Sequence, residues 1–411
     1  MGDPEHFILW FLALLASGSV VVPVNPDSPN TDVRRNLSRA GATFLYDGGA
    51  VPRLLSDPWQ KPSVAEGGLI LLTSGSTGEP KPVGLPWRSL WHAALGVARA
   101  HHLTRTDRGF SPLPLFHINA LVVGVLSTLS QGASVMIPER FHASNFWQVA
   151  ESADVTWINA VPTIIGVLAT REEKPQHPER IRFMRSASAP LPASLRRRAE
   201  ALFHIAIVET YGMTEAGSQI TANPLPEEGR RPGSVGRPWG IQVRVVNQKG
   251  EPLPPGVRGF VEIRGPGVLD PLWGPNGWAW SSFHDGWYRT GDLGRLDQDG
   301  YLYLVGRSRD TINRGGEKIF PREVEEWLLT SPDVAEAVVL GHPHPVLGEE
   351  PIAYVAPLPG KRLTEDILKA WAERGLAKFK RPSHFVILPE LPKGSTGKIL
   401  KQVLRRERPP K

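Results

Sequence analysis

The order of apolar and amphipathic stretches restricts the fold of this chain more than any other feature of its sequence. Apolar runs rich in β-branched residues lie at 68–73, 134–138, 155–162 and 205–212. Stretches with helical periodicity lie between these runs, at 88–100, 143–151 and 193–202. Because strands that alternate with helices form layers around a mainly parallel sheet, we predict layered α/β structure up to about Ala222.

The pattern changes after Gly233, where short β runs are separated by Gly, Pro and Asn. Residues 241–265 predict an antiparallel or β-barrel-like region. The Asp299-Gly300 pair between two alternating runs predicts a hairpin rather than a calcium loop, because the other calcium-ligand positions are missing.

A smaller unit begins after Gly306. Helices are predicted at 321–329 and 364–374, with a further β run between them. Thr364 is a favourable N-cap residue for the second helix. A chain of 411 residues is also too long for one core. We therefore expect a large N-terminal domain of layered α/β sheets with the barrel-like region, residues 1–308, and a small α+β C-terminal domain, residues 309–411.

Composition excludes several classes of protein. The chain has no Cys, which rules out disulfides and a Cys nucleophile. We read its formal charge of +6 as an Arg-rich solvated surface and expect no nucleic-acid partner. The uncharged run 7–24 approaches the length of a membrane span, but Ser17-Gly18-Ser19 interrupts it and its flank is acidic. We predict a buried helix that leads into a buried strand, no membrane span, and a cytoplasmic protein.

A loop rich in Gly, Ser and Thr follows the apolar run at 68–73. It reads TSGSTGEPK over residues 73–81. The backbone N–H groups of such a loop, followed by a Lys, suit a phosphate group. The spacing differs from that of the common NTPase P-loop, and a flexible linker is the alternative interpretation.

The loop and four later motifs resemble the adenylate-forming superfamily, which includes acyl-CoA synthetases, luciferase and peptide-synthetase adenylation domains. The later motifs are YGMTEAG (211–217), RTGDLGRLDQDGYLYLVGRSRD (289–310), INRGGEKIFPREVE (312–325) and LPKGSTGKILK (391–401). The resemblance covers almost the whole chain. It implies a ligase that joins a carboxylate to AMP with release of pyrophosphate and then passes the acyl group to CoA, using ATP, Mg²⁺ and CoA. The substrate carboxylate is then itself the nucleophile, so the protein has to position groups and stabilise charge.

The resemblance implies roles for individual residues. Lys398 would reach the substrate carboxylate and the α-phosphate, Thr214 would bind the same phosphate, and Glu215 would bind Mg²⁺. His117 would act as a gate of the acyl pocket. The implied ATP- and AMP-binding residues are Thr73, Ser74, Gly75, Ser76, Thr77, Gly78, Lys81, Ala189, Pro190, Glu209, Tyr211, Gly212, Met213, Asp292 and Arg307. The implied acyl-pocket residues are His117, Val161, Ser186, Ser188 and Gly217.

The small domain is implied to be mobile, with a hinge near Asp310. Gly315 and Gly316 would face the thiol arm after the domain turns. Structural alternatives stay open: a β-turn for the two glycines, an Asx turn for Asp292 and an interdomain ion pair for Arg307.

Shorter stretches resemble one branch of the superfamily, the oxalate–CoA ligases of plants and fungi and their bacterial relatives. They are FHASNFW (141–147), TWINAVPTI (156–164), IRFMRSASAPL (181–191), MTEAGSQITANPLP (213–226) and INRGGEKI (312–319). Polar Ser residues and His117 suit a short second carboxylate, whereas a fatty chain needs an apolar tunnel. We therefore predict a small carboxylic or dicarboxylic acid such as oxalate. Arg185 would strengthen this prediction if it lay in the pocket.

The chain departs from the resemblance in its N-terminal part. The opening portion of the family is missing, and the segment between Tyr46 and Gly67 is short. We expect these losses to affect stability and dimerisation more than chemistry, and a homodimer is left open. The alternatives are an enzyme that loads a carrier protein, a medium- or long-chain fatty acid–CoA ligase, and a nucleotide-binding protein without ligase activity.

Overall fold

The computed structural model describes residues 3–47, 53–55, 67–74, 80–268, 272–274, 277–279, 283–394 and 398–406. Of residues 73, 74, 80, 81, 227, 272–274, 277–279 and 284 it describes the backbone alone.

A seven-stranded sheet forms the centre of the molecule, with strand order β12-β11-β10-β9-β8-β6-β7. Its strands are β6 (Arg108–Phe110), β7 (Ser134–Met136), β8 (Trp157–Ala160), β9 (Phe183–Ser186), β10 (Ile207–Met213), β11 (Ser218–Ala222) and β12 (Arg237–Pro238). Neighbouring strands from β7 to β10 are parallel, and β11 is antiparallel to both of its neighbours. The predicted, mainly parallel sheet is confirmed.

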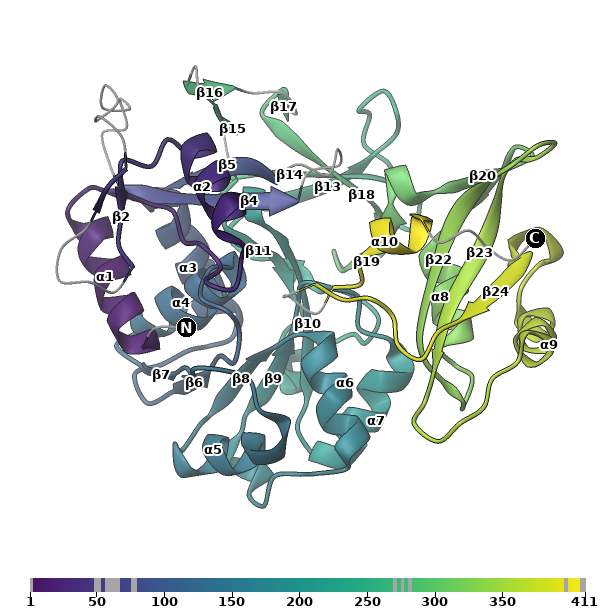
Figure 1. Cartoon of the computed structure of the whole chain (residues 1–411), viewed down its shortest axis with the longest axis horizontal. Coiled ribbons are helices and arrows are strands. Elements are labelled where there is room, and N and C mark those ends of the chain that lie inside the picture. Colours follow the sequence, from purple (N-terminus) through teal and green to yellow (C-terminus); the bar gives the residue numbers. More distant parts are fainter. Residues whose placement is uncertain are drawn as a thin grey trace.

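Helices cover both faces of this sheet. One face packs on α5 (Phe146–Ser152), α6 (Pro162–Arg171) and α7 (Ala193–Phe203), through a core that contains Ile158 and Met184. The other face packs on α3 (Trp87–Ala100) and the π-helix η1 (Asn119–Leu126), which continues as α4 (Ser127–Leu129), through a core that contains Trp157 and Phe183. Figure 1 shows α6 and α7 on one side of β8 and β9 and α3 and α4 on the other. Adjacent strand residues thus point to opposite layers, as period-two side chains require.

A three-stranded sheet packs beside this centre, with β1 (Val20–Val21) at its edge next to β4 (Gly68–Ser74), and β5 (Pro80–Pro86) antiparallel to β4. Helices α1 (Pro4–Ala16) and α2 (Asn30–Arg39) and the pair β2 (Phe44–Leu45) and β3 (Arg53–Leu54) complete this region. A helix is confirmed at α1, but the prediction that it is buried is wrong. Only Pro4, Phe11 and Leu15 of α1 are buried, and Leu9 is 58% exposed, because one face of the helix packs on the core and the other faces solvent. The predicted buried strand is wrong: β1 has two residues and Val20 is exposed, because an edge strand has a neighbour on one side only. No helix in the described ranges is long and apolar enough to cross a membrane.

The region after Gly233 is an open antiparallel sheet in the described part of the chain. Its strands are β13 (Gln242–Val246), β14 (Gly259–Arg264), β17 (Phe283–His284), β18 (Trp287–Leu296) and β19 (Leu302–Arg307). The antiparallel pairing is confirmed, but barrel closure is not seen among these strands, because β13 pairs with β14 alone. The hairpin is also confirmed: the Asp297 carboxylate accepts hydrogen bonds from the backbone N–H groups of Asp299 and Tyr301 between β18 and β19.

The C-terminal unit is α+β. Its elements are β20 (Ile312–Arg314), β21 (Glu317–Ile319), α8 (Pro321–Leu328), β22 (Val334–His344), β23 (Gly348–Pro357), α9 (Glu365–Gly375), β24 (His384–Ile387) and α10 (Lys401–Arg406). Thr364 caps α9 as predicted, with its hydroxyl oxygen 3.3 Å from the Ile367 nitrogen. The apolar cores of this unit contain buried residues from 312 to 404 only. That separation supports the predicted boundary at residue 308, which remains a prediction.

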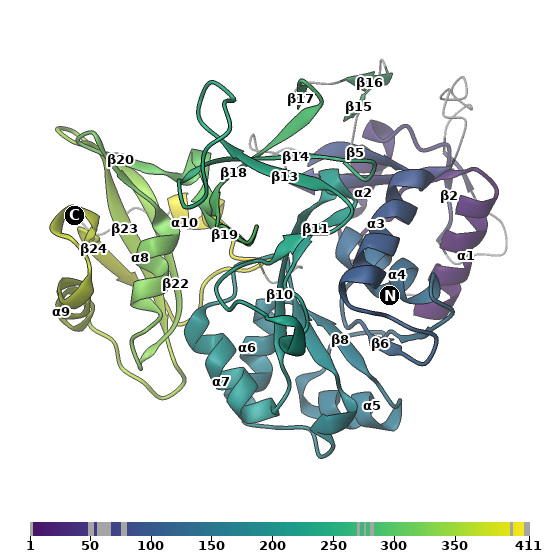
Figure 2. The ribbon, with the colours of Figure 1, turned by 180° about the vertical axis from the view of Figure 1, so that it is seen from behind.

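The remaining short elements are β15 (Leu272–Gly274), β16 (Gly277–Ala279), η2 (Ala143–Asn145), η3 (Pro178–Arg180), η4 (Thr214–Ala216), η5 (Pro226–Glu228), η6 (Ser308–Asp310) and η7 (Lys378–Lys380). The chain that precedes α10 leaves the C-terminal unit and extends towards β10 in both ribbon views (Figures 1 and 2). This extension brings a distant part of the sequence to the central sheet.

Candidate active site

Tyr211, Asp292 and Arg307 meet where β10, β18 and β19 come together. The Tyr211 hydroxyl donates a hydrogen bond of 2.5 Å to Asp292 Oδ2, and Arg307 Nε lies 2.8 Å from Asp292 Oδ1. The register of β18 and β19 sets Asp292 opposite Arg307. Burial raises the pKa of Asp292, while Arg307 and the Tyr211 hydroxyl oppose that shift. The carboxylate is therefore held in place through both of its oxygens.

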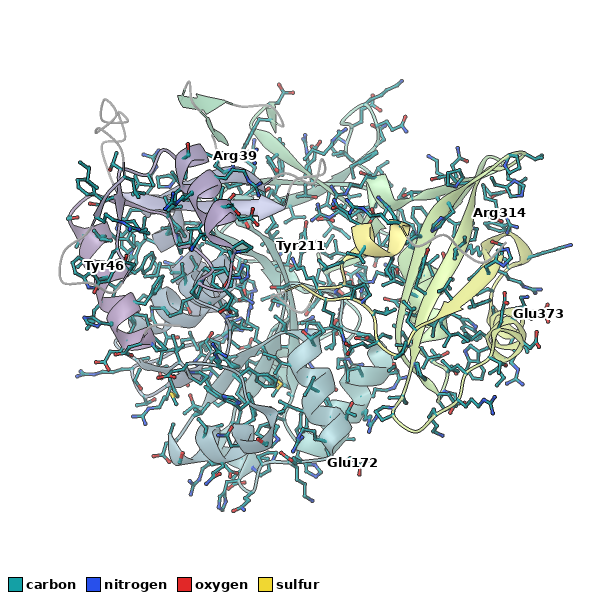
Figure 3. The ribbon with its side chains drawn as sticks, in the orientation of Figure 1. Arg39, Tyr46, Glu172, Tyr211, Arg314 and Glu373 are labelled. Carbon is teal, nitrogen blue, oxygen red and sulfur yellow. The ribbon has the colours of Figure 1, made fainter. Side chains whose placement is uncertain are left out.

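These contacts test two structural alternatives, an interdomain ion pair for Arg307 and an Asx turn for Asp292. Arg307 pairs with Asp292 on the neighbouring strand, so its ion pair lies inside the predicted large domain and not between domains. An Asx turn is not observed at Asp292, because its carboxylate accepts no hydrogen bond from a following backbone N–H among the described residues. The Asp292 N–H instead donates to the Thr290 hydroxyl at 3.1 Å. Tyr211 lies near the centre of the molecule, far from peripheral residues such as Glu172 and Glu373 (Figure 3).

Lys398 reaches the same place from the chain that precedes α10. Partial burial and then the Arg307 charge lower the pKa of Lys398, and the carboxylates of Asp292 and Glu215 oppose that shift. The residue is nevertheless exposed, so a ligand can approach it. Burial and then Lys398 also lower the pKa of His117, to about 4. The structure thus brings together His117, Glu215, Asp292, Arg307 and Lys398, as the sequence predicted.

Glu215 is suited to hold a magnesium ion. It lies in η4, directly after the end of β10. Burial raises the pKa of its carboxyl group, and it forms no ion pair with any residue that the structure describes. Mg²⁺ in nucleotide sites typically takes one or two carboxylates together with phosphate oxygens and water. A single unpaired carboxylate beside Asp292 fits that donor set.

The predicted acyl end contains polar atoms without partners. His117 Nε2 and Ser186 Oγ are buried and have no hydrogen-bond partner among the described residues. Ser188 is exposed and has a positive φ of 72°, an uncommon conformation for a non-glycine residue that often marks a functional site. Ala189 and Pro190 are also exposed, whereas Val161, the residue directly before α6, is buried.

Several other predicted residues have structural partners of their own. Glu209 lies 3.6 Å from Arg196 and accepts a hydrogen bond from the Gly233 N–H. Gly217 packs on α3, where an added Cβ would lie 3.0 Å from Ala93 Cβ. Gly315 has a φ of 59° and Gly316 a φ of 94°, and they form the two-residue turn between β20 and β21. The β-turn alternative is thus observed, and a role towards the thiol stays a prediction.

The phosphate loop lies largely outside the described residues. Gly75, Ser76, Thr77 and Gly78 are not described, and for Thr73, Ser74 and Lys81 only the backbone is described, in β4 and β5. Met213 ends β10 and Thr214 begins η4, next to Glu215. The loop's role towards phosphate therefore stays a prediction.

Gly212 is required by the backbone itself. It lies at a bulge between β10 and β11, where an added Cβ would lie 1.6 Å from the Ser218 carbonyl oxygen. We expect Gly212→Ala to destabilise the fold by at least about 2 kcal/mol, since backbone cannot move aside as a side chain can. Urea unfolding measures this loss. Gly166→Ala in α6, where the added Cβ would lie 3.6 Å from Leu195, is the control and should be neutral or stabilising. Equal midpoints for both variants would contradict the prediction.

His101 gives the fold a defined pH dependence. It is fully buried, its ring stacks on Phe183, and its Nε2 lies 3.3 Å from Gln219 Oε1. Burial and the Arg185 charge lower its pKa from 6.5 to about 3. Between these values the unfolded chain binds a proton that the folded protein excludes. The contribution of neutral, buried His101 to the free energy of unfolding is therefore fully present above pH 6.5. It is lost as the pH falls towards 3, at roughly 1.4 kcal/mol per pH unit.

Urea unfolding between pH 7 and pH 5 tests this expectation. The free energy of unfolding of the wild type should decrease as the pH is lowered from 7 to 5. The decrease should be smaller in His101→Gln, because glutamine does not titrate. His117 acts in the same direction, since its pKa is also lowered, so some slope should remain in the variant. An unchanged slope in His101→Gln would show that another group controls the acid response.

Comparison with known proteins shows the family of this chain. The family model of the AMP-binding enzyme matches residues 58–273, and that of the AMP-binding enzyme C-terminal domain matches residues 323–398. The chain belongs to the AMP-binding enzyme family. The two matches fall in the two predicted domains of this AMP-binding enzyme and include Glu215 and Lys398.

Relatives and solved structures agree with this assignment. The chain is 43% identical to sulfoacetate–CoA ligase of Cupriavidus necator, over 84% of this chain and 68% of that protein. It is 42% identical to oxalate–CoA ligase of Arabidopsis thaliana, over 82% of this chain and 67% of that protein. It is similar to ATP-bound MatB from Rhodopseudomonas palustris, with a TM-score of 0.86 and 27% identity over 98% of this chain and 86% of that chain.

A further solved relative is o-succinylbenzoate CoA synthetase from Bacillus subtilis in complex with its acyl-adenylate, with a TM-score of 0.84 and 28% identity over 100% of this chain and 87% of that chain. The predicted superfamily and enzyme class, an AMP-forming acid–CoA ligase, are confirmed by these matches. The AMP-binding CoA ligases use ATP, Mg²⁺ and CoA, as predicted for this chain. A homodimer, a cytoplasmic location and the roles of individual residues remain predictions.

Proposed function

We propose that this AMP-binding enzyme activates a small carboxylic or dicarboxylic acid, with oxalate as the first candidate. The observation that carries the proposal is the polar acyl end, where His117 Nε2 and Ser186 Oγ are buried without partners in the described part of the chain. Buried polar atoms usually have a hydrogen-bond partner, so these two atoms without partners suit a polar substrate. Relatives named for oxalate and sulfoacetate support the same conclusion.

In the first half-reaction the substrate carboxylate attacks the α-phosphorus of ATP, and pyrophosphate leaves. Both reacting groups are anionic, so their approach is disfavoured unless a cation lies between them. Lys398 supplies that cation in our proposal, and the Asp292 carboxylate accepts hydrogen bonds from the ribose hydroxyls. His117 is neutral at ordinary pH because its pKa is about 4, so it contributes hydrogen bonds and not charge. Mg²⁺ bound at Glu215 would neutralise phosphate charge.

The second half-reaction needs a thiol at the carbon that Lys398 has just approached. We propose that the C-terminal unit turns about Asp310 to admit it, as the mobile-domain prediction requires. In the present arrangement Asp310 lies 2.9 Å from Lys401 and 3.6 Å from Arg405, both in α10. These ion pairs hold the helix that follows Lys398 against the hinge. They would break or re-form as the unit turns.

Carboxylate-dependent exchange of pyrophosphate into ATP tests this function. Oxalate and malonate should support exchange, while aromatic acids and long-chain fatty acids should support little. Release of AMP should then depend on CoA and not on a panel of carrier proteins. Exchange with fatty acids alone would contradict the substrate class. No exchange with any acid would favour a nucleotide-binding protein without ligase activity.

A further inference from the structure

Arg185 places a positive charge deep inside the large α/β unit. It lies on β9, and its side chain is 1% exposed. Its guanidinium donates to three amide oxygens: from Nη1 to Asn119 Oδ1 at 2.9 Å and Asn159 Oδ1 at 3.1 Å, and from Nη2 to Gln219 Oε1 at 3.3 Å. No carboxylate pairs with it among the described residues. A buried Arg usually has such a partner, so this charge is uncompensated.

The guanidinium fixes the orientation of the amides around it. Arg has only donors, so each amide must turn its oxygen towards the cation and its NH₂ group away. The Asn119 NH₂ group therefore faces outward, where it donates to Ser188 Oγ at 3.3 Å. Asn119 begins the π-helix η1, two residues after His117, and helical segments of this kind are frequent at functional sites. Ser188 lies between the buried network and solvent.

Ser188 can pass this polarity on to a ligand. Because its oxygen accepts from Asn119, its hydroxyl hydrogen is free to donate to a group at the acyl end. A chain of hydrogen bonds that starts at a cation polarises each member in turn, and the effect is stronger where water is excluded. His101 does not alter the charge of this network, since its lowered pKa keeps it neutral at ordinary pH. The positive charge of Arg185 therefore polarises the hydrogen-bond chain that ends at Ser188.

We propose that Arg185 determines specificity by acting through Asn119 and Ser188, and that it favours acids with a second anionic group at the acyl end. The inference rests on the proposed function, which it deepens. The second carboxylate of oxalate or malonate, or a sulfonate, supplies the counter-charge that the protein lacks. The corresponding monoamide has the same shape but no charge, so it gains only an ordinary hydrogen bond. Arg185 is a positioning residue in this account, because Ser188 and not Arg185 touches the substrate.

The test compares each dicarboxylate with its monoamide: oxalate with oxamate, and malonate with malonamate. Pyrophosphate exchange gives kcat/KM for each acid, and the ratio within a pair reports the preference for the second charge. Wild type should favour the dicarboxylate. Arg185→Met keeps the volume but removes the charge, and should lower the ratio at least about tenfold. Arg185→Lys should keep more of the preference, because it retains the cation.

Asn119→Asp provides a second variant if Arg185→Met does not fold. It puts a carboxylate of nearly the same shape beside the guanidinium, cancels the free charge, and should lower the ratio as well. Arg182→Met is the matched control: this cation lies three residues earlier in the chain but is already paired with Asp107 at 2.6 Å. It can reduce stability, but it should leave the ratio unchanged.

The outcomes separate the inference from the function on which it rests. If wild type exchanges pyrophosphate with none of the four acids, the proposed function fails, and the inference fails with it. If wild type is active and the ratio is the same in wild type, Arg185→Met and Asn119→Asp, the inference alone is overturned. A lower ratio in both variants with an unchanged ratio in Arg182→Met supports it.

Discussion

Replacement of Lys398 by Ala is expected to reduce acyl-adenylate formation at least about 1,000-fold, while thioester formation from a preformed acyl-adenylate continues. Lys398 is the cation that the C-terminal segment adds to a site already containing Asp292, Glu215 and Arg307. In the proposed first half-reaction it would lie between the two anionic reactants. In the second half-reaction the acyl-adenylate is already made and the attacking group is a thiol, so the ammonium group has no such task.

The two half-reactions are measured separately. Pyrophosphate exchange reports the first, and chromatography of acyl-CoA formed from synthetic acyl-adenylate reports the second. Lys393→Ala is the matched control, because Lys393 lies in the same segment but pairs with Glu336 at 2.7 Å within the C-terminal unit. This control should keep both activities. Equal loss of both half-reactions in Lys398→Ala would contradict the proposed role.

Asp292→Asn is expected to weaken ATP binding by about 100-fold. The carboxylate has two accepting oxygens, which hold Arg307 and Tyr211 in this structure and would also face the ribose diol. Asn keeps one acceptor and leaves the Arg307 cation beside a neutral group, so the change costs both a charge-assisted hydrogen bond and the ion pair. Calorimetric titration with ATP measures the affinity directly.

Two further variants separate binding from stability. Tyr211→Phe removes only the hydroxyl that donates to Asp292, and it should weaken ATP binding less than Asp292→Asn does. Asp297→Asn changes a carboxylate in the turn of the same β18–β19 hairpin, and this carboxylate pairs with Arg231 at 2.7 Å. It should lower stability without changing ATP affinity. Wild-type affinity in Asp292→Asn would remove Asp292 from the nucleotide site.

Pairing of neighbouring strands brings the motif residues of the site together in this fold. Tyr211 lies in β10 two residues before its end, Asp292 in β18 pairs with Arg307 at the end of β19, and Lys398 lies in the segment between β24 and α10. A motif fixes both the residue type and the local backbone, so distant motifs can be expected to converge on one ligand. The electrostatic coupling of Lys398 to Asp292 and Arg307 agrees with that expectation.

The Arg185 network could not be predicted from the sequence. The sequence shows only that Arg185 is a basic residue near the predicted acyl pocket. Its partners Asn119, Asn159 and Gln219 come from η1, β8 and β11, which share no sequence pattern. A polar residue in an apolar run was the only available signal. It does not say which of the two faces of a strand the residue occupies or what it contacts.

The edge position of β1 and the open form of the antiparallel sheet also could not be predicted from the sequence pattern. An apolar run such as 20–24 has the composition of a buried strand, but its burial depends on whether neighbours lie on both sides, and β1 has β4 on one side only. Alternation within 241–265 likewise predicted antiparallel strands correctly. It contains no information on whether the first and last strands of the sheet pair, and in the described residues β13 and β17 lie at opposite ends.

A crystal structure with ATP and Mg²⁺ bound tests the central claim most directly, that a motif-built site on the large unit and Lys398 from the C-terminal unit act on one phosphate. We predict that the ribose hydroxyls lie within hydrogen-bond distance of Asp292 and that Lys398 faces the α-phosphate. A nucleotide bound away from Asp292, or a Lys398 that faces solvent with ATP in place, would contradict the account.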